Sequence, residues 1–319
     1  KTSTNLNSDP VNMLLHCLRL GISTGIYGLV LTNMLNDIIM GEAEIGFDPV
    51  GLRIIDPDYI NIMTTGHQHA FFRDLEEYLV SPEAMKAAEQ AGAKGFRIVG
   101  CTCVGQDFQL RKAAGTGVFC GHTSEAVLMT GCVDLVVSEF NCTLPGIEPI
   151  CDELKIPQIC LDDVAKKANA EYVKYSYRER RNISERIAGA AVNAYSARKS
   201  GRNNPMRDHG YPDAITGVTE MTLKDFLGGS FGPLIELIQQ GKIKGIAGVV
   251  GCSNLRAKGH DVFTVELAKE LIARDIIVLS AGCTCGGLEN CGLMSPSASE
   301  LAGPGLKEVC QSLGIPPVL

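Results

Sequence analysis

The sequence predicts an α/β protein in which two Rossmann-like, doubly wound parallel-sheet units follow the end of a helical region. Short β-branched apolar runs recur along the chain, with the length and composition of strands buried on both faces. The segments between these runs carry apolar residues at helical spacing. Glycine is abundant, with 35 residues, and it suits the tight strand-to-helix turns of such a fold.

The length of 319 residues exceeds one typical domain. We expect the end of a helical domain over residues 1–45, a first Rossmann-like domain over 46–200, and a second, incomplete one over 201–319. A breaker-rich stretch, residues 200–212, is the predicted linker between the two Rossmann-like domains.

The residues expected to be helical at the start begin with a capping signal. Ser8 or Asp9 precedes Pro10, and apolar residues then follow at helical spacing from Val11. A second apolar stretch over residues 27–40 continues the helix, and a loop with two prolines separates it from the first strand.

The two α/β units are predicted from alternating runs. In the first unit we expect strands at 60–63, 96–99, 133–137 and 157–160, and helices at 71–91, from 144, and at 178–199. In the second unit we expect helices at 223–240 and 262–273 and strands at 245–250 and 276–279.

Charge and apolar patterning exclude several classes of partner. The chain has 29 basic and 36 acidic residues and a net charge of −7, so we expect no nucleic-acid partner. No window has the roughly 18 uninterrupted apolar residues of a membrane span, and no apolar signal core opens the chain. We therefore expect a cytoplasmic protein whose 13 cysteines are reduced.

Five of the apolar runs lead, within a few positions, to a cysteine or histidine. Parallel sheets collect functional groups at the carboxyl ends of their strands, so remote loops can assemble one site there. Thiolate and imidazole ligands favour iron, nickel or an iron-sulfur cluster. The side chains in question are His67, Cys101 or Cys103, Cys142, Cys252 and Cys283.

Other residues have less direct interpretations. His69 is expected either to face the same cavity or to lie in a solvated first helical turn. Cys285 and Cys291 are spare thiols, and Cys160, which also ends a strand, is a further candidate ligand. The remaining cysteines fit core positions, and the phosphate-loop and nucleophile-elbow motifs are missing.

Five loops, in their order along the chain, resemble those of the anaerobic nickel-containing carbon monoxide dehydrogenases. They are Gly66-His67, Gly100 to Asp107, Asn141-Cys142, Gly251 to Asn254 and Gly282-Cys283. The similarity to that family extends to the opening Asn5 to Pro10 and to the helix through Leu18 to Gly21. The resemblance therefore covers essentially the whole chain.

The resemblance implies a nickel-iron-sulfur cluster and a site of five ligands. It implies oxidation of carbon monoxide with water to carbon dioxide, and the reverse, with electrons passed to a ferredoxin-like carrier. Cys103 is preferred over Cys101 because it stands two residues before Gly105, as the family's ligand does. The matching metal ligands would be His67, Cys103, Cys142, Cys252 and Cys283.

The resemblance also implies parts outside this chain. Relay 4Fe-4S clusters, a last cysteine ligand and a catalytic lysine are expected elsewhere in a longer protein, which would form a homodimer. No catalytic residue is assigned within the chain, which looks like an internal fragment that is inactive as it stands.

Three departures from the family pattern keep alternatives open. Thr102 splits the family's adjacent cysteines, the His67 loop reads Gly-His-Gln-His, and the Cys283 loop carries extra thiols. These departures suit a nickel-free iron-sulfur-oxygen hybrid cluster, as in the related hybrid cluster proteins that reduce hydroxylamine. An alternative of another class is a non-catalytic metal-binding module whose cysteines hold zinc or nothing.

Overall fold

The computed structural model separates the chain into two compact units, residues 1–42 and 43–319. The predicted boundary between residues 200 and 201 stays a prediction, because most of the predicted linker lies outside the described residues. The structure describes residues 8–111, 118–122, 124–139, 142–164, 166–201, 213–253 and 256–319.

Residues 10–40 of the first unit form one continuous helix. It comprises α1 (Pro10–Ser23), a π-helical turn (Thr24–Leu29) and α2 (Val30–Met40). The Asp9 side chain accepts a hydrogen bond from the Val11 backbone N–H at 3.0 Å, which confirms the predicted helix start. By length and composition alone this helix could cross a membrane, with a mean hydropathy of 1.5 in its most apolar window. A packed helix of a soluble protein has the same properties, so the feature is weak evidence for a membrane span.

The larger sheet of the second unit is a Rossmann-type parallel sheet. Among the described residues its strand order is β4-β3-β2-β5-β6-β7, and every neighbouring pair is parallel. The order reverses between β2 and β5, which creates a crevice at their carboxyl ends. The strands are β2 (Ile60–Thr64), β3 (Phe96–Cys101), β4 (Val118–His122), β5 (Leu135–Ser138), β6 (Gln158–Cys160) and β7 (Ala170–Tyr172).

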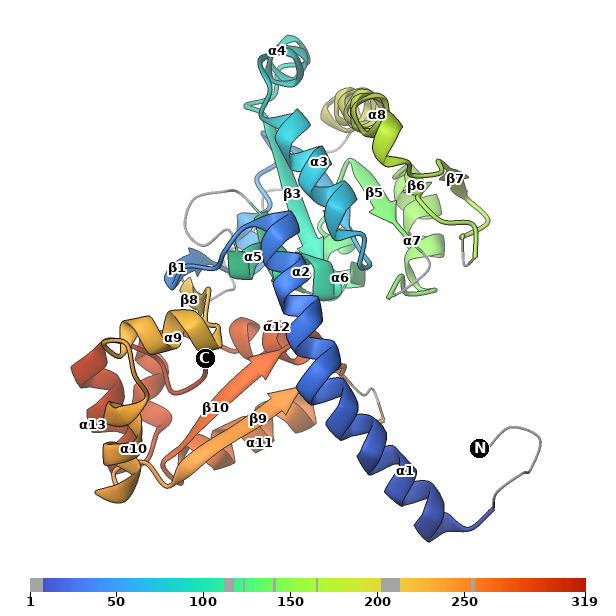
Figure 1. The fold of residues 1–319 in the computed structure, drawn as a ribbon. Helices are drawn as coiled ribbons and strands as arrows, with labels where there is room; N and C mark the ends of the chain where they lie inside the picture. Colours follow the sequence, from blue (N-terminus) through green and yellow to red (C-terminus); the bar gives the residue numbers. More distant parts are fainter. Residues whose placement is uncertain are drawn as a thin grey trace. The chain divides into compact units, whose positions relative to one another are not determined.

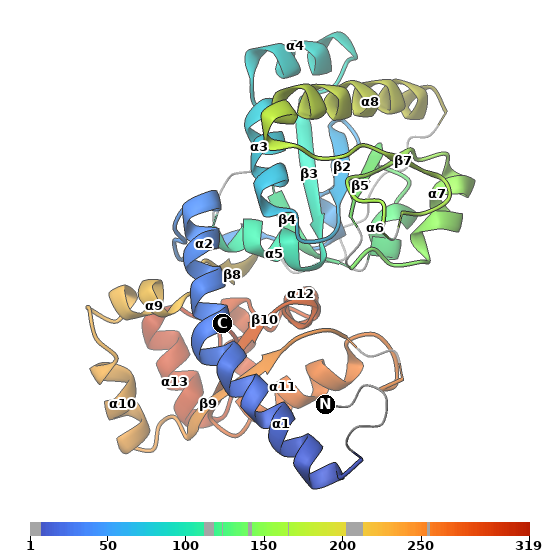
Figure 2. The ribbon, with the colours of Figure 1, turned by 45° about the vertical axis from the view of Figure 1, so that its right-hand side comes forward.

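Helices cover both faces of this sheet (Figures 1 and 2). On one face α3 (His69–Leu79), α4 (Pro82–Gln90) and α8 (Arg180–Gly201) pack together. On the other face α6 (Ser124–Met129) and α7 (Ile147–Leu154) share a core with residues of β2, β3 and β5. The strands β2 and β5 are buried along their whole length, as predicted from their apolar composition.

The smaller parallel sheet pairs β9 (Gly245–Val250) with β10 (Ile276–Ala281), and Val318 bridges to Val278 in parallel. A separate antiparallel pair joins β1 (Gly46–Pro49) to β8 (Asp213–Thr216). The helices around these strands are α9 (Glu220–Phe226), α10 (Gly232–Gln239), α11 (Val262–Ile272), α12 (Cys283–Asn290) and α13 (Pro304–Leu313). Short 3-10 turns lie at Leu52–Ile54, Tyr177–Glu179 and Pro296–Leu301.

Two long predicted helices are each divided in the structure. The segment 71–91 breaks before Pro82, where the Ser81 hydroxyl caps α4 by accepting from the Ala84 N–H at 3.3 Å. The segment 223–240 breaks at Gly228 and Gly229, whose φ values of +84° and +91° do not fit a right-handed helix. The prediction of single helices was wrong because apolar spacing continues through both breaks.

Candidate metal centre

Each of the five predicted ligands lies just beyond the carboxyl end of a parallel strand. His67 follows β2, Cys142 follows β5, and Cys103 is the second residue of α5 (Thr102–Arg111), which follows β3. These three strands are neighbours in the large sheet. Cys252 and Cys283 follow β9 and β10, which are neighbours in the small sheet.

Cys103 joins the two sheets. Its sulfur accepts hydrogen bonds from Cys283, which comes from the small sheet, and from His67, which comes from the large one. These bonds lower the pKa of the Cys103 thiol to about 5. A thiolate is the form of cysteine that binds metals, so the site favours the reactive form of this residue.

His67 is the positive partner of this thiolate. Hydrogen bonds to Cys103 and then to Glu139 raise the pKa of the imidazole to about 10. Nδ1 of His67 lies 3.4 Å from Oε1 of Glu139, and the same oxygen accepts from the His67 backbone N–H. The Glu139 side chain is almost completely buried, so its charge faces His67 without much screening by water.

Cys142 interacts electrostatically with Cys103 and Cys252. Burial raises the pKa of Cys142 to about 11, and the negative charges of Cys103 and Cys252 add to the increase. Cys142 is half-buried and has a φ of +57°, which is uncommon for a residue other than glycine. Electrostatic interactions therefore connect Cys142 to Cys103 and Cys252, and the assignment of all five side chains to one metal site stays a prediction.

Glycines allow the loops of this group to approach each other closely. The Thr284 N–H and hydroxyl both donate to the Gly251 carbonyl at 3.0 Å, which ties the loop of Cys283 to that of Cys252. A Cβ at Gly282 would lie 2.9 Å from that carbonyl oxygen, and one at Gly66 would lie 2.0 Å from Cγ of Glu139. Side chains at these two positions would displace the loops.

Thr102 holds the loop of His67 against the start of α5. Its hydroxyl accepts from the Gly66 N–H at 3.1 Å, and the Val104 N–H donates to the Gly66 carbonyl at 3.1 Å. Thr102 itself has a φ of +67°, an unfavourable conformation for a β-branched residue. Backbone strain of this kind costs about 1–3 kcal/mol and concentrates at functional sites.

The other candidate cysteines lie apart from this group. Cys101 is fully buried in the apolar core of the large sheet, so Cys103 is the residue that faces His67. The thiol of Cys160 donates to the Asp162 carbonyl at 2.9 Å. Cys285 is half-buried, with its sulfur 3.5 Å from that of Met294, and Cys291 is exposed.

Two acidic residues of the site were missed in the sequence. Glu139 directly follows a buried strand and stands three residues before Cys142, and that position was a usable signal. Asp107 lies one helical turn after Cys103 and bonds to His69 at 2.7 Å. The ring of His69 therefore turns towards α5, and of the two alternatives for this residue the solvated helical turn was wrong.

The donor set of this group fits an iron-sulfur or nickel-iron-sulfur cluster. Thiolates and imidazole are the ligands that such metals prefer, and in a cluster each ligand binds a different metal atom. Within the described ranges, no three His, Cys, Asp or Glu side chains lie close enough together to hold one metal ion. Their role as metal ligands stays a prediction.

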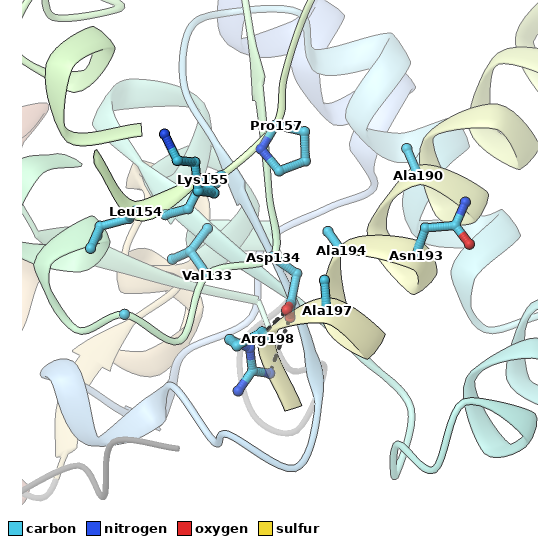
Figure 3. A pocket seen from close by; sticks show the side chains of 12 residues that line it. Val133, Asp134, Leu154, Lys155, Pro157, Ala190, Asn193, Ala194, Ala197 and Arg198 are labelled. Atoms are coloured by element: carbon cyan, nitrogen blue, oxygen red, sulfur yellow. Dashed lines mark hydrogen bonds and ion pairs between the residues drawn. The ribbon is translucent and has the colours of Figure 1, made fainter. Parts of the chain in front are cut away.

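A separate cavity of about 550 Å³ lies at the amino ends of β5 and β6, at the edge of the sheet opposite to the cysteines. Figure 3 shows the ion pair of Asp134 and Arg198 at this cavity, with Pro157 and alanines of α8 around it. Ligands of doubly wound sheets bind at the carboxyl ends of the strands, so this edge is the less favoured one.

Comparisons with known proteins agree with the geometry. The chain is 46% identical to a carbon monoxide dehydrogenase of Methanocaldococcus jannaschii and 42% identical to one of Methanopyrus kandleri. Both alignments cover 100% of the chain, and they cover 52% and 50% of the relatives. The chain therefore spans about half the length of the curated relatives it matches.

Solved structures show the same fold. A nickel-free carbon monoxide dehydrogenase from a Thermococcus species matches 99% of the chain and 49% of its own length, with a TM-score of 0.89 and 32% identity. Carbon Monoxide Dehydrogenase IV from Carboxydothermus hydrogenoformans matches 99% of the chain and 51% of its own length, with a TM-score of 0.88 and 30% identity. The predicted α/β fold is confirmed by these likenesses.

A family model described as "Prismane/CO dehydrogenase family" matches residues 1–319. The match covers the five strand-end loops and the helical start together. The chain belongs to the Prismane/CO dehydrogenase family.

Proposed function

We propose that this chain is part of a carbon monoxide dehydrogenase and helps to hold its nickel-iron-sulfur cluster. The observation that carries the proposal is the interaction of Cys103 with His67 from one sheet and Cys283 from another. The relatives' names and the family match support carbon monoxide as the substrate. The proposed ligands are His67, Cys103, Cys142, Cys252 and Cys283.

When bound, the cluster would supply redox metals that take up the gas and store two electrons. The reaction consumes one carbon monoxide and one water and yields carbon dioxide, two protons and two electrons. We also propose the finer features that the resemblance implies: 4Fe-4S relay clusters outside this chain, a ferredoxin-like acceptor, a homodimer and a cytoplasmic location.

The chain's own residues prepare the site. Glu139 accepts a hydrogen bond from the backbone N–H of His67 and lies 3.4 Å from Nδ1 of its ring, which orients the imidazole. Thr102 and Val104 bind the Gly66 peptide groups and dock the loop on α5. The large sheet then supplies the imidazole and two thiols, and the small sheet supplies two more thiols.

The test uses the full-length protein, purified without oxygen. Iron, nickel and sulfide are quantified, and carbon monoxide-dependent reduction of a viologen dye is measured. We expect all three elements and gas-dependent reduction, with a loss of more than about 100-fold in Cys103→Ala and Cys283→Ala, as for removal of an essential cofactor ligand. Cys291→Ser is the matched control, because Cys291 is exposed at the end of the same helix as Cys283.

Two results would contradict the proposal in different ways. Iron and sulfide without nickel, with hydroxylamine reduction, would assign a hybrid cluster instead. Protein without iron, sulfide or charge-transfer absorption would assign a non-catalytic module.

A further inference from the structure

His69 connects the loop of His67 to the helix of Cys103. Its Nδ1 lies 2.7 Å from the His67 carbonyl oxygen, and its Nε2 lies 2.7 Å from Oδ2 of Asp107 on α5, both within hydrogen-bond distance. The ring is mostly buried, with a side-chain exposure of 15%, which limits competition from water.

Asp107 is itself fixed in place. Its Oδ1 accepts from Nη1 of Arg111 at 3.1 Å, and the Arg111 side chain is only 1% exposed. Cys103, Asp107 and Arg111 follow one another at intervals of one helical turn, so they lie along one face of α5. His69 therefore attaches to the same helix face that carries the Cys103 sulfur.

We propose that His69, held by Asp107 and Arg111, is a positioning residue that sets the separation between the His67 imidazole and the Cys103 sulfur. The inference rests on the proposed function, since the pair is positioned for the cluster. It gives a role to His69, the second histidine of the Gly-His-Gln-His loop, which is not one of the five proposed ligands.

The remaining bonds of the loop do not replace this contact. The bonds to Thr102 and Val104 hold the peptide groups of Gly66, on the amino-terminal side of His67. On the carboxyl-terminal side the His67 carbonyl accepts from the His69 ring and from the His69 backbone N–H at 3.0 Å. Without the ring, the His67–Gln68 peptide loses its connection to α5 and gains freedom to rotate.

The experiment compares full-length, anaerobically purified holoenzyme with His69→Ala, with Asp107→Asn, whose amide oxygen can still accept from Arg111, and with the double variant. The rate of iron transfer to the chelator bathophenanthroline disulfonate is measured, together with the electron paramagnetic resonance spectrum of the cluster. We expect each single variant to lose iron about tenfold faster, within the range for residues that orient metal ligands. The double variant should match the single ones, because both remove the same connection.

Tyr175→Phe is the matched control. It removes a hydrogen bond of 2.8 Å from Tyr175 to Asp74, which lies on the helix that begins at His69 but away from its loop. We expect its iron loss to stay within about twofold of the unaltered protein. His69→Gln keeps a side-chain N–H donor, so it should restore part of the retention, and it decides the question if His69→Ala does not fold.

The outcomes separate this inference from the proposed function. Unaltered iron loss in His69→Ala, or additive effects in the double variant, would overturn the positioning role. A lower melting temperature with an unchanged resonance spectrum would also overturn it, because the role would then be only structural. If the unaltered protein contains no iron and sulfide, it is the proposed function that fails.

Discussion

Glu289 is a fully buried carboxyl group on α12, the helix that begins at Cys283. Burial raises its pKa from 4.5 to about 8, and Asp48 adds to the increase while Gln109 opposes it. The group is therefore neutral in the folded protein at neutral pH. At the scale of single residues, this buried carboxyl group makes the free energy of unfolding depend on pH.

We expect Glu289→Gln to remove that pH dependence. A folded-state pKa above the unfolded one means that the folded protein binds the proton more tightly between pH 4.5 and about 8. The stabilisation is full below pH 4.5 and is lost as the pH rises through 8. At pH 9 the free energy of unfolding of Glu289→Gln should exceed that of the unaltered protein by a few kcal/mol. This difference is on the order of the free energy that links the pKa shift to folding. Urea unfolding between pH 5 and 9 measures the difference.

Glu300→Gln is the control for this substitution. The Glu300 side chain is 64% exposed and pairs with Lys307 at 2.6 Å, so it should change stability by less than about 0.5 kcal/mol at every pH. Parallel stability curves for Glu289→Gln and the unaltered protein would contradict the assignment to Glu289.

At the scale of elements, Gly105 determines how closely α5 packs on β3. A Cβ at Gly105 would lie 2.5 Å from the carbonyl carbon of Gly100, where backbone meets backbone. Neither element has room to move without shifting Cys103, which lies in the same helical turn.

Gly105→Ala should therefore destabilise the protein by about 1–3 kcal/mol, as expected for a steric clash in a packed interior. Gly189→Ala makes the same change in α8, where nothing lies within 4 Å of the added Cβ. There alanine should raise the free energy of unfolding by up to about 1 kcal/mol, because it lowers the backbone entropy of the unfolded chain. Thermal unfolding of the two variants tests the contrast, and equal effects would refute it.

The buried ion pair of Asp134 and Arg198 joins α8 to β5. Arg198 Nε donates to Oδ1 at 2.7 Å, and the Asn61 N–H donates to Oδ2 at 2.8 Å. Side-chain exposures are 0% for Asp134 and 6% for Arg198, and Figure 3 shows the pair beside the cavity.

We expect Arg198→Met to destabilise by about 3–5 kcal/mol, because it leaves the Asp134 carboxylate buried and uncompensated. Asp134→Leu combined with Arg198→Met should recover part of the loss, since both charges are then gone. Arg181→Met is the control: Arg181 and its partner Glu83 are 72% and 57% exposed, so it should cost less than about 1 kcal/mol. Urea titration compares them, and similar losses for the two arginine variants would argue against a buried pair.

At the scale of the whole molecule, the candidate site draws on two separate sheets. Its side chains approach one another through loops that belong to different hydrophobic cores. A bound cluster would therefore link the two cores as well as stabilise each loop, because binding to the folded state adds its free energy to folding.

Removing the metal from the full-length protein should increase amide hydrogen exchange at the ligand loops. We expect at least about tenfold faster exchange over residues 66–69, 102–107 and 282–285, where loop order depends on the ligands. The long helix α8 serves as the internal control, since its contacts are with α3, α4 and the large sheet. Equal exchange in both states would show that the loops are held by the protein alone.

Much of the fold follows from local pattern. The runs at β2, β3, β5, β9 and β10 were predicted because each is apolar and β-branched enough to be buried. The strands β1, β4, β7 and β8 were missed, since glycine, proline or charged residues interrupt the short apolar run of each. Helix breaks at Pro82 and Gly228 were missed because the apolar spacing continues past them.

By itself the sequence determined which residues stand at strand ends, and with them the donor types and the resemblance to the family. That information is local, because strand burial and turn chemistry depend on neighbouring residues. Only the tertiary structure showed that Cys103 interacts with His67 and Cys283 while Cys101 is buried in the core, and that Glu139 and Asp107 contact the residues of the imidazole loop. Those contacts join residues far apart in the chain, so they depend on strand order and helix packing that no local pattern contains.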